Sequence, residues 1–132
     1  AWVNLLPVTA VIATSETVGA GGGYAALATA GPVVTLLTGT SVLVIVGFTG
    51  SNASVNGGNF MAVDVTGAST IAAADINAFQ FTSFTAGNGG SGSFASLLSG
   101  LPAGQNTFTS LYKAPTGTGT FLNRNITVIP LG

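Results

Sequence analysis

The sequence predicts an all-β protein, namely an antiparallel β-sandwich of jelly-roll-like form with about eight strands. Helix-forming residues are scarce, whereas Val, Ile, Thr and Phe recur in short runs. Gly, Asn, Ser or Pro bounds these runs, and such spacing is typical of sandwiches and barrels. The chain has 132 residues, which is enough for one hydrophobic core but not for two.

The apolar runs place the expected strands at short intervals along the chain. They lie near residues 8–14, 23–29, 33–37, 41–49, 59–66, 79–84, 93–99, 105–112 and 120–129. Glycine-rich separators at residues 19–23, 56–58 and 88–90 supply positions where a positive φ is cheap, so we expect turns or loops there. The Ala-Ala-Ala-Asp segment at residues 72–75 predicts one short helical turn.

Two of the runs differ in their hydrophobic pattern. Residues 61–66 alternate between apolar and more polar side chains, as a half-buried strand does, and this pattern points Asp64 outward. Residues 42–46 are apolar without alternation, which predicts a central strand covered on both faces. The predicted core includes Val44, Val63, Phe108 and Ile126, because each of them lies inside a run and not in a turn.

The first seven residues differ from the rest of the chain, and residues 8–132 are expected to form a single sandwich domain. Residues 1–7 are apolar, irregular and closed by a proline, which interrupts strand pairing. We interpret them as an N-terminal arm in which Trp2, Leu5 and Leu6 contact a partner, because such a segment gains little by folding alone. The alternative, that this segment is the first strand of the sandwich, stays open.

The chain carries few groups that could perform chemistry. Its charged residues are Glu16, Asp64, Asp75, Lys113 and Arg124, its net charge is -1, and it has no His and no Cys. The commonest base, thiolate ligands and disulfides are therefore excluded. Two cations cannot neutralise several phosphates, so nucleic acid is not an expected partner. The longest strongly apolar run, residues 42–46, is far shorter than the roughly 20 residues of a membrane-spanning helix, so no membrane partner is expected.

Two short patterns match enzyme motifs, but the strands expected around them favour a structural role over a catalytic or nucleotide-binding one. Ser110 and Lys113 form an S-x-x-K pattern, whose members lie one helical turn apart in serine acyl-transfer enzymes. Here the context is a strand, in which residues i and i+3 point to opposite faces. Residues 87–92 match G-x-G-x-x-G, yet a strand is expected to follow them and not the helix that binds phosphates, so we predict a flexible surface loop.

The three carboxylates do not have the spacing of a known metal loop. Asp64 and Asp75 are separated without a D-x-D-x-D-G arrangement, so all three carboxylates are interpreted as isolated and solvated. A glycosidase pair formed by Glu16 and an Asp on folding stays open, although no feature of the sequence favours it. We therefore expect no enzyme, no metal and no cofactor.

Four segments together resemble a known module. They are residues 28–32 (ATAGP), 65–75 (VTGASTIAAAD), 99–108 (SGLPAGQNTF) and 119–131 (GTFLNRNITVIPL). In this order they are similar to a β-sandwich module of tailed-phage virion proteins, and the likeness covers most of residues 11–131. The loops at residues 22–24 and 87–93 are enlarged relative to the module, so no individual contact residue is carried over.

The resemblance implies a jelly-roll-like fold and a structural place on a virion. Similar modules occur on phage heads and in tail fibres, and a single sandwich without a shaft fits a capsid decoration, or cement, protein better. Such a protein would be made in the host cytoplasm and bind the outer surface of the head. Its expected partners are the major capsid protein and further copies of itself, as a homotrimer.

Other functions stay open, namely a tail-fibre or head-fibre module and a carbohydrate-binding β-sandwich. Jelly rolls often hold sugars on an aromatic platform. Trp2, Tyr24 and Tyr112 are the only Trp and Tyr residues of the chain. The eight Phe residues are poorer sugar platforms and are expected to fill the core.

Overall fold

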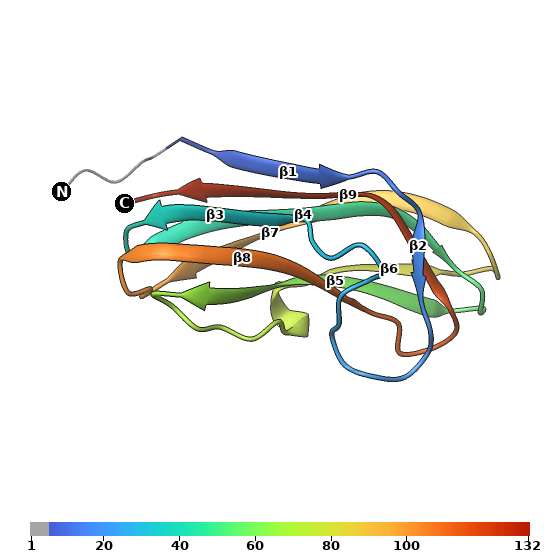
Figure 1. The fold of residues 1–132 in the computed structure, drawn as a ribbon. Helices are drawn as coiled ribbons and strands as arrows, with labels where there is room; N and C mark the ends of the chain where they lie inside the picture. The colour runs from blue at the N-terminus through green and yellow to red at the C-terminus, as the bar shows by residue number, and fades with distance from the viewer. Residues whose placement is uncertain (1–5) are drawn as a thin grey trace.

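The computed structural model describes residues 6–132 as two antiparallel sheets packed face to face (Figure 1). The five-stranded sheet contains β1 (Val8–Ile12), β2 (Glu16–Val18), β4 (Ser41–Asn52), β7 (Gly89–Ser99) and β9 (Gly119–Pro130). The four-stranded sheet contains β3 (Val33–Thr38), β5 (Gly57–Gly67), β6 (Phe79–Ser83) and β8 (Gly104–Lys113). This architecture confirms the predicted antiparallel sandwich.

The order of the strands in each sheet differs from their order in the chain. The five-stranded sheet runs β1-β9-β4-β7, with β2 beside another part of β9, and the four-stranded sheet runs β3-β8-β5-β6. The last strand therefore lies between the first strand and β4, and Val8 is opposite Val128. Because each sheet joins distant parts of the chain, neither sheet is complete until the C-terminal part of the chain has folded.

The core lies between the two sheets and contains the residues predicted for it. Val44, Val63, Phe108 and Ile126 are all buried. At one end of the core the ring of Phe121 packs edge-on against the rings of Phe48 and Tyr112, with centroid distances of 4.8 and 5.0 Å. Aromatic pairs in this geometry add to the stabilisation that burial provides.

Strand β4 is central, as predicted, but the prediction that both of its faces are covered is wrong. Val42, Val44 and Val46 are buried between the sheets, whereas Leu43 and Ile45 are only partly buried on the outer side. Within residues 6–132 no element packs over that outer side with enough contact to bury them. In this strand the unbroken apolar run at residues 42–46 therefore forms one covered face and one apolar face that is partly exposed.

Two other local predictions need correction. Residues 23–29 form no strand, although Ala25 pairs with Tyr112 in an isolated bridge. The glycine-rich segment predicted as a loop at residues 87–92 lies in β7 from Gly89 onward. Glycine is suited to this strand because the rings of Phe81 and Phe79 in β6 approach the positions that Cβ atoms would occupy at Gly90 and Gly92.

Helical structure in the described residues is limited to one short element. The 3₁₀ helix η1 (Asp75–Asn77) begins at the end of the Ala-rich segment, where the sequence predicts a helical turn. No helix in residues 6–132 is long and apolar enough to cross a membrane.

A bulge in β9 decides which of its side chains enter the core. Gly47 is opposite Asn125 and Thr49 is opposite Leu122, so two residues of β9 oppose one residue of β4 between these pairs. Asn123, within the bulge, has a φ of 48°. Such an extra residue shifts the inward and outward alternation of a strand. As a result Phe121 and Arg124, three residues apart, are both fully buried.

Candidate functional site

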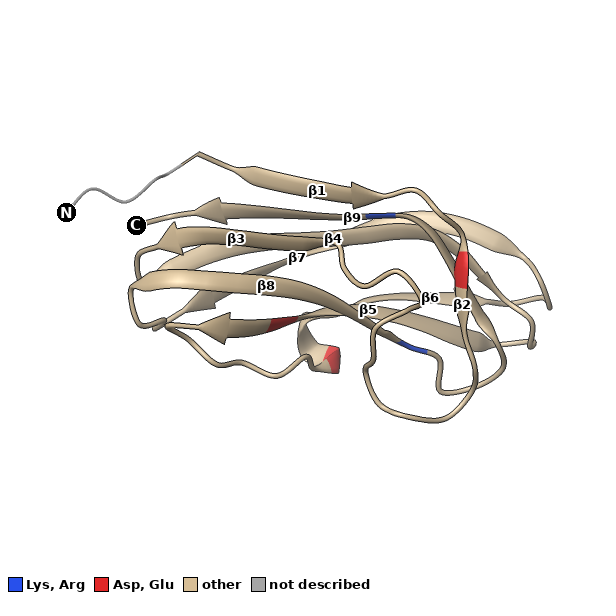
Figure 2. Cartoon of the chain, in the orientation of Figure 1, with Lys and Arg blue, Asp and Glu red and all other residues tan. Residues whose placement is uncertain are grey.

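The structure uses the charged residues mainly to hold one loop, residues 19–32, against the sandwich. Figure 2 shows how sparse the charges are over the whole fold. Arg124 in β9 and Glu16 in β2 form one ion pair, and Lys113 at the end of β8 and Asp75 in η1 form the other. Both pairs contact residues of the loop.

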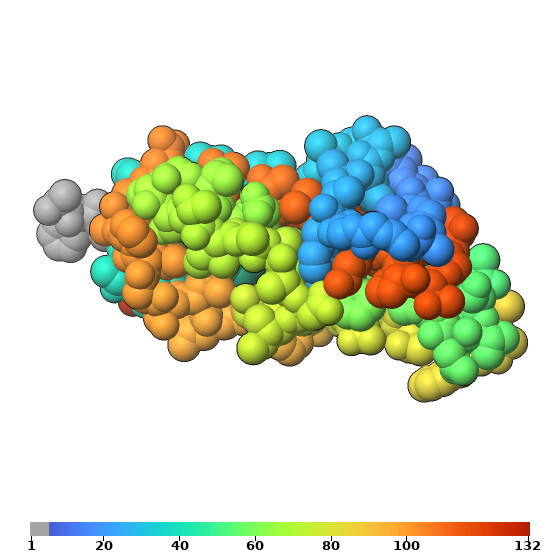
Figure 3. Space-filling model, turned by 90° about the horizontal axis from the view of Figure 1, so that it is seen from below, coloured from blue at the N-terminus to red at the C-terminus, as the bar shows by residue number. Residues whose placement is uncertain are grey.

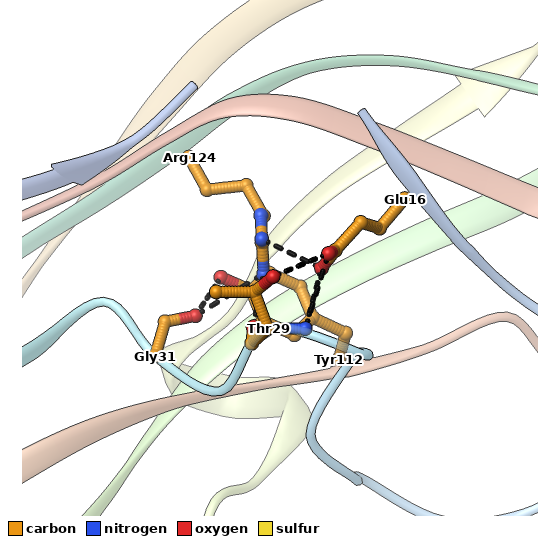
Figure 4. A network of polar contacts seen from close by, with 5 residues as sticks. All are labelled: Glu16, Thr29, Gly31, Tyr112 and Arg124. Atoms are coloured by element: carbon orange, nitrogen blue, oxygen red, sulfur yellow. Dashed lines mark hydrogen bonds and ion pairs between the residues drawn. The ribbon is translucent and has the colours of Figure 1, made fainter. Parts of the chain in front are cut away.

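The first ion pair binds the end of the loop that leads into β3 (Figure 4). The Nη2 atom of Arg124 donates to Oε1 of Glu16 at 2.8 Å, and the Arg124 side chain is fully buried. The Glu16 carboxylate also accepts the backbone N–H of Thr29 at 2.9 Å and its hydroxyl at 2.6 Å. These hydrogen bonds from Thr29, followed by the charge of Arg124, hold the pKa of Glu16 below its ordinary value.

The same guanidinium is also bound to backbone carbonyls of the loop. Nη1 of Arg124 donates to the carbonyl oxygens of Thr29 at 3.2 Å and Gly31 at 3.3 Å. The hydroxyl of Tyr112 donates to the Gly31 carbonyl at 2.8 Å, and burial raises the pKa of Tyr112 to about 12. Buried charges are tolerated when they are paired and hydrogen-bonded in this way.

The second ion pair binds the middle of the loop on the outer face of the four-stranded sheet. Nζ of Lys113 lies 2.7 Å from Oδ1 of Asp75, and the Tyr24 hydroxyl donates to the same oxygen at 2.8 Å. The ammonium group also lies 4.7 Å from the ring centroid of Tyr24 and 5.0 Å from that of Phe60, within the range of cation–π attraction. The hydrogen bonds from Lys113 and then Tyr24 lower the pKa of Asp75.

The loop therefore has a base held by hydrogen bonds and an exposed glycine-rich tip. Residues 19–23 are exposed to solvent, and they precede Tyr24, which is partly buried. Figure 3 shows the loop and the segment that contains η1 on the same face of the molecule. Surface loops held by a rigid scaffold are frequent binding elements, and both ion pairs of the described residues anchor this loop.

A second surface, the outer face of the five-stranded sheet, has a different character. The only charged residues in its strands are Glu16 and Arg124, which pair with each other. Leu43 is opposite both Leu97 and Ile129 on neighbouring strands, and Ile45 lies two residues along the same face. We call Leu43, Ile45, Leu97 and Ile129 the outer apolar strip. It is an uncharged surface that crosses β7, β4 and β9.

Of the three contact residues predicted for the arm, Leu6 alone belongs to the described residues. Trp2 and Leu5 are outside the described residues. Leu6 is 69% exposed and precedes the first residue of β1 by two positions.

The two members of the S-x-x-K pattern point to opposite faces of the sheet, as predicted for residues i and i+3 of a strand. Ser110 is buried in the core, whereas Lys113 points to the outer face and pairs with Asp75. The prediction that all carboxylates are isolated is wrong for Glu16 and Asp75, because both accept several hydrogen bonds. In the described residues no three carboxylates lie close enough to hold a metal ion.

One signal for the buried ion pair is visible in the sequence. Arg124 is the only charged residue of the strand predicted at residues 120–129. A single charged side chain in such a strand requires a partner of opposite charge if it is buried. The bulge that turns Arg124 inward, and the position of Glu16, depend on tertiary contacts. Tyr112, one of the three candidate sugar-platform residues, is fully buried and cannot contact a ligand.

No model of a known protein family matches the chain. No curated protein matches its sequence either.

Its fold does match solved structures. A chain of infectious bursal disease virus, Gx strain, aligns with 96% of this chain at 12% identity and a TM-score of 0.58. Eiger TNF from S. frugiperda aligns with 96% of this chain and 92% of its own length, at 12% identity and a TM-score of 0.57. The VP2 subviral particle of infectious bursal disease virus gives a TM-score of 0.53 at 11% identity.

These likenesses concern the fold. The chain spans 33% and 32% of the length of the two virus chains, and nearly all of Eiger TNF. The chain thus shares its β-sandwich fold both with chains of a virus particle and with Eiger TNF.

Proposed function

We propose that the chain is a non-enzymatic capsid decoration, or cement, protein that binds the outer surface of a tailed-phage head. The observation that carries this proposal is the distribution of charge. Four of the five charged residues hold one loop in place, which leaves the outer face of the five-stranded sheet uncharged and partly apolar. Such a surface is suited to burial against protein, since contiguous apolar patches on soluble proteins mark interaction sites.

Two further observations support a role in a virion. The four sequence segments that resemble the phage module lie in elements that build this structure, including β8 and β9. The fold is also shared with chains of a virus particle. In this proposal the partners are the major capsid protein and two further copies of the chain, because a homotrimer would cover apolar surface that a monomer exposes.

The proposed capsid contact is the N-terminal segment. Trp2, Leu5 and Leu6 would bind the capsid protein. The exposed side chain of Leu6 beside the start of β1 supports this assignment.

The experiment is decoration of phage heads that lack the protein. Purified full-length chain and a chain without residues 1–6 are each added to bare heads, and occupancy is measured from electron cryomicroscopy density. We expect full-length protein to bind the outer head surface and the truncated protein to bind weakly while remaining folded. Full occupancy by the truncated chain would contradict the arm assignment.

The location and mass measurements test the remaining parts of the proposal. Density on the tail would replace the head assignment by a tail-fibre role, and density on a projecting head fibre would indicate a head-fibre module. Sedimentation equilibrium that gives the mass of a monomer would contradict the trimer. Binding to a glycan array that Tyr24→Ala abolishes would favour a carbohydrate-binding function instead.

A further inference from the structure

The free edge of β7 differs from the other sheet edges in its length. β7 has 11 residues and pairs only with β4 among the described strands. The other edge strands are shorter, since β3 has six residues, β6 has five, and β1 and β2 have five and three. A short edge strand offers few unpaired backbone groups, whereas a long one can pair with another strand.

β7 also lacks the features that protect an edge from pairing. It contains no charged residue and no proline. Its register with β4 is unbroken from Ser41 opposite Ser99 to Ser51 opposite Gly89, so no bulge turns the edge away. Most of its residues are exposed, including Phe94 at 40% and Leu97 at 62%. The N–H and C=O groups along this edge therefore pair with no described strand, and an extended partner could use them.

The packing beneath β7 holds this edge in position. A Cβ atom at Gly92 would lie 2.8 Å from the ring of Phe79, and one at Gly90 would lie 2.6 Å from the ring of Phe81. Phe79 in turn packs against Phe48, with their ring centroids 4.9 Å apart. Aromatic rings from β6 lie directly under the backbone of β7 and support it from the core side, and no described strand pairs with its second edge.

We propose that β7 pairs with β7 of a second copy of this chain, antiparallel and across a twofold axis, so that the five-stranded sheets of two copies become one continuous sheet. A copy of itself matches this edge in length, in its lack of charge and in its backbone hydrogen-bonding pattern. Twofold interfaces bring the same surface of both subunits together. With Ser93 near the twofold axis, Leu97 of each copy lies beside the Gly89 end of β7 in the other copy.

The small area of this edge indicates a weak affinity between two copies in solution. An 11-residue strand is about 36 Å long at the usual rise per residue. A stable interface buries about 800 Å² per partner, roughly an eighth of the 6048 Å² surface of the described chain. Backbone pairing alone covers a narrow strip, so the side chains beside it must contribute. Pairing is therefore weak in dilute solution and is strengthened when copies are held on a common surface.

This pairing is independent of the proposed role in a virion. Identical strands pair antiparallel about a twofold axis, so β7 pairing cannot occur within a threefold trimer and would instead join two trimers. The two proposals can consequently fail separately.

The first test places a charge on the edge. Ser93 is exposed on the outer side of β7, and Thr35 is exposed on the edge strand β3 of the other sheet. We expect the mass of the wild-type chain in sedimentation equilibrium to rise with concentration. Ser93→Lys should weaken this association at least about tenfold, because the twofold axis brings two lysines together. Thr35→Lys should change it less than about twofold.

The second test uses the absence of cysteine from the chain. Under mild oxidation, Ser93→Cys should yield disulfide-linked dimers on a denaturing gel, and Thr35→Cys should not. Circular dichroism and urea unfolding of each variant show that it is folded. A wild-type chain with concentration-independent mass, or a Ser93→Cys variant that cross-links no better than Thr35→Cys, overturns the proposal. A trimer whose mass is unchanged by Ser93→Lys, with no cross-linking, overturns the β7 pairing and leaves the trimer standing.

Discussion

The Nη2 atom of Arg124 lies 2.8 Å from Oε1 of Glu16, a residue 108 positions earlier in the chain. This contact joins β9 to β2, and through Thr29 it also joins the 19–32 loop to both strands. The loop is therefore connected to the core by a charged network whose central member is fully buried.

Replacing Arg124 should strongly destabilise the fold. Arg124→Ala removes a large buried side chain and leaves the Thr29 carbonyl without its donor, so the free energy of unfolding should fall by about 3–5 kcal/mol. Urea unfolding followed by circular dichroism measures this change. Asp64→Asn is a control for altered charge, because Asp64 lies on the outer side of β5, and it should change stability by less than about 0.5 kcal/mol. A loss below about 1 kcal/mol for Arg124→Ala would contradict the structural role of the network.

Stability should decrease in acid because of the two anchoring carboxylates. The pKa values of Glu16 and Asp75 are lower in the folded chain than their ordinary values of 4.5 and 3.8. The unfolded chain thus binds protons at a higher pH than the folded chain does. Their contribution to stability is present above the ordinary values and is lost as pH falls below them, toward the lower folded pKa values.

Urea unfolding at a series of pH values measures this effect. Glu16→Gln should flatten the acid decline that begins below about pH 4.5, and Asp75→Asn should flatten the decline that begins at lower pH. An acid decline of the same slope in both variants and the wild type would show that other groups cause it.

Truncation of Phe108 should reveal its place in the core. Phe108 is fully buried, whereas Phe84 is 76% exposed. We expect Phe108→Ala to lower the free energy of unfolding by about 3–5 kcal/mol and Phe84→Ala to lower it by less than about 0.5 kcal/mol. Thermal and urea unfolding of the two variants provide the comparison, and equal losses would contradict the assigned burial.

Adding a methyl group to β7 should disturb its contact with β6. The Cβ atom of Gly92→Ala would lie 2.8 Å from Cζ of Phe79, so the ring must shift and stability should fall by about 1–3 kcal/mol. Gly23→Ala is the matched control, because no heavy atom beyond its chain neighbours lies within 4 Å of the position that its Cβ would occupy. Urea unfolding measures both variants. A Gly92→Ala variant as stable as Gly23→Ala would indicate that the Phe79 ring is loosely held.

The fold class is predictable because strand patterning is local. Residues 61–65 alternate in the sequence, and Met61, Val63 and Val65 are buried in β5. By contrast, the strand predicted at residues 23–29 is absent. The backbone there pairs with Tyr112 through Ala25 alone, and the Tyr24 hydroxyl binds Asp75.

Residue types and their short-range spacing are sufficient to predict an all-β sandwich with very few charges, since both properties can be assessed one segment at a time. The places where those charges act depend on contacts between distant segments. The bulge at Asn123 turns Arg124 inward, and folding brings Glu16 to it from the far end of the chain. The free edge of β7 likewise depends on strand order, because whether a strand has one neighbour or two is set by pairing between distant segments and not by its own residues.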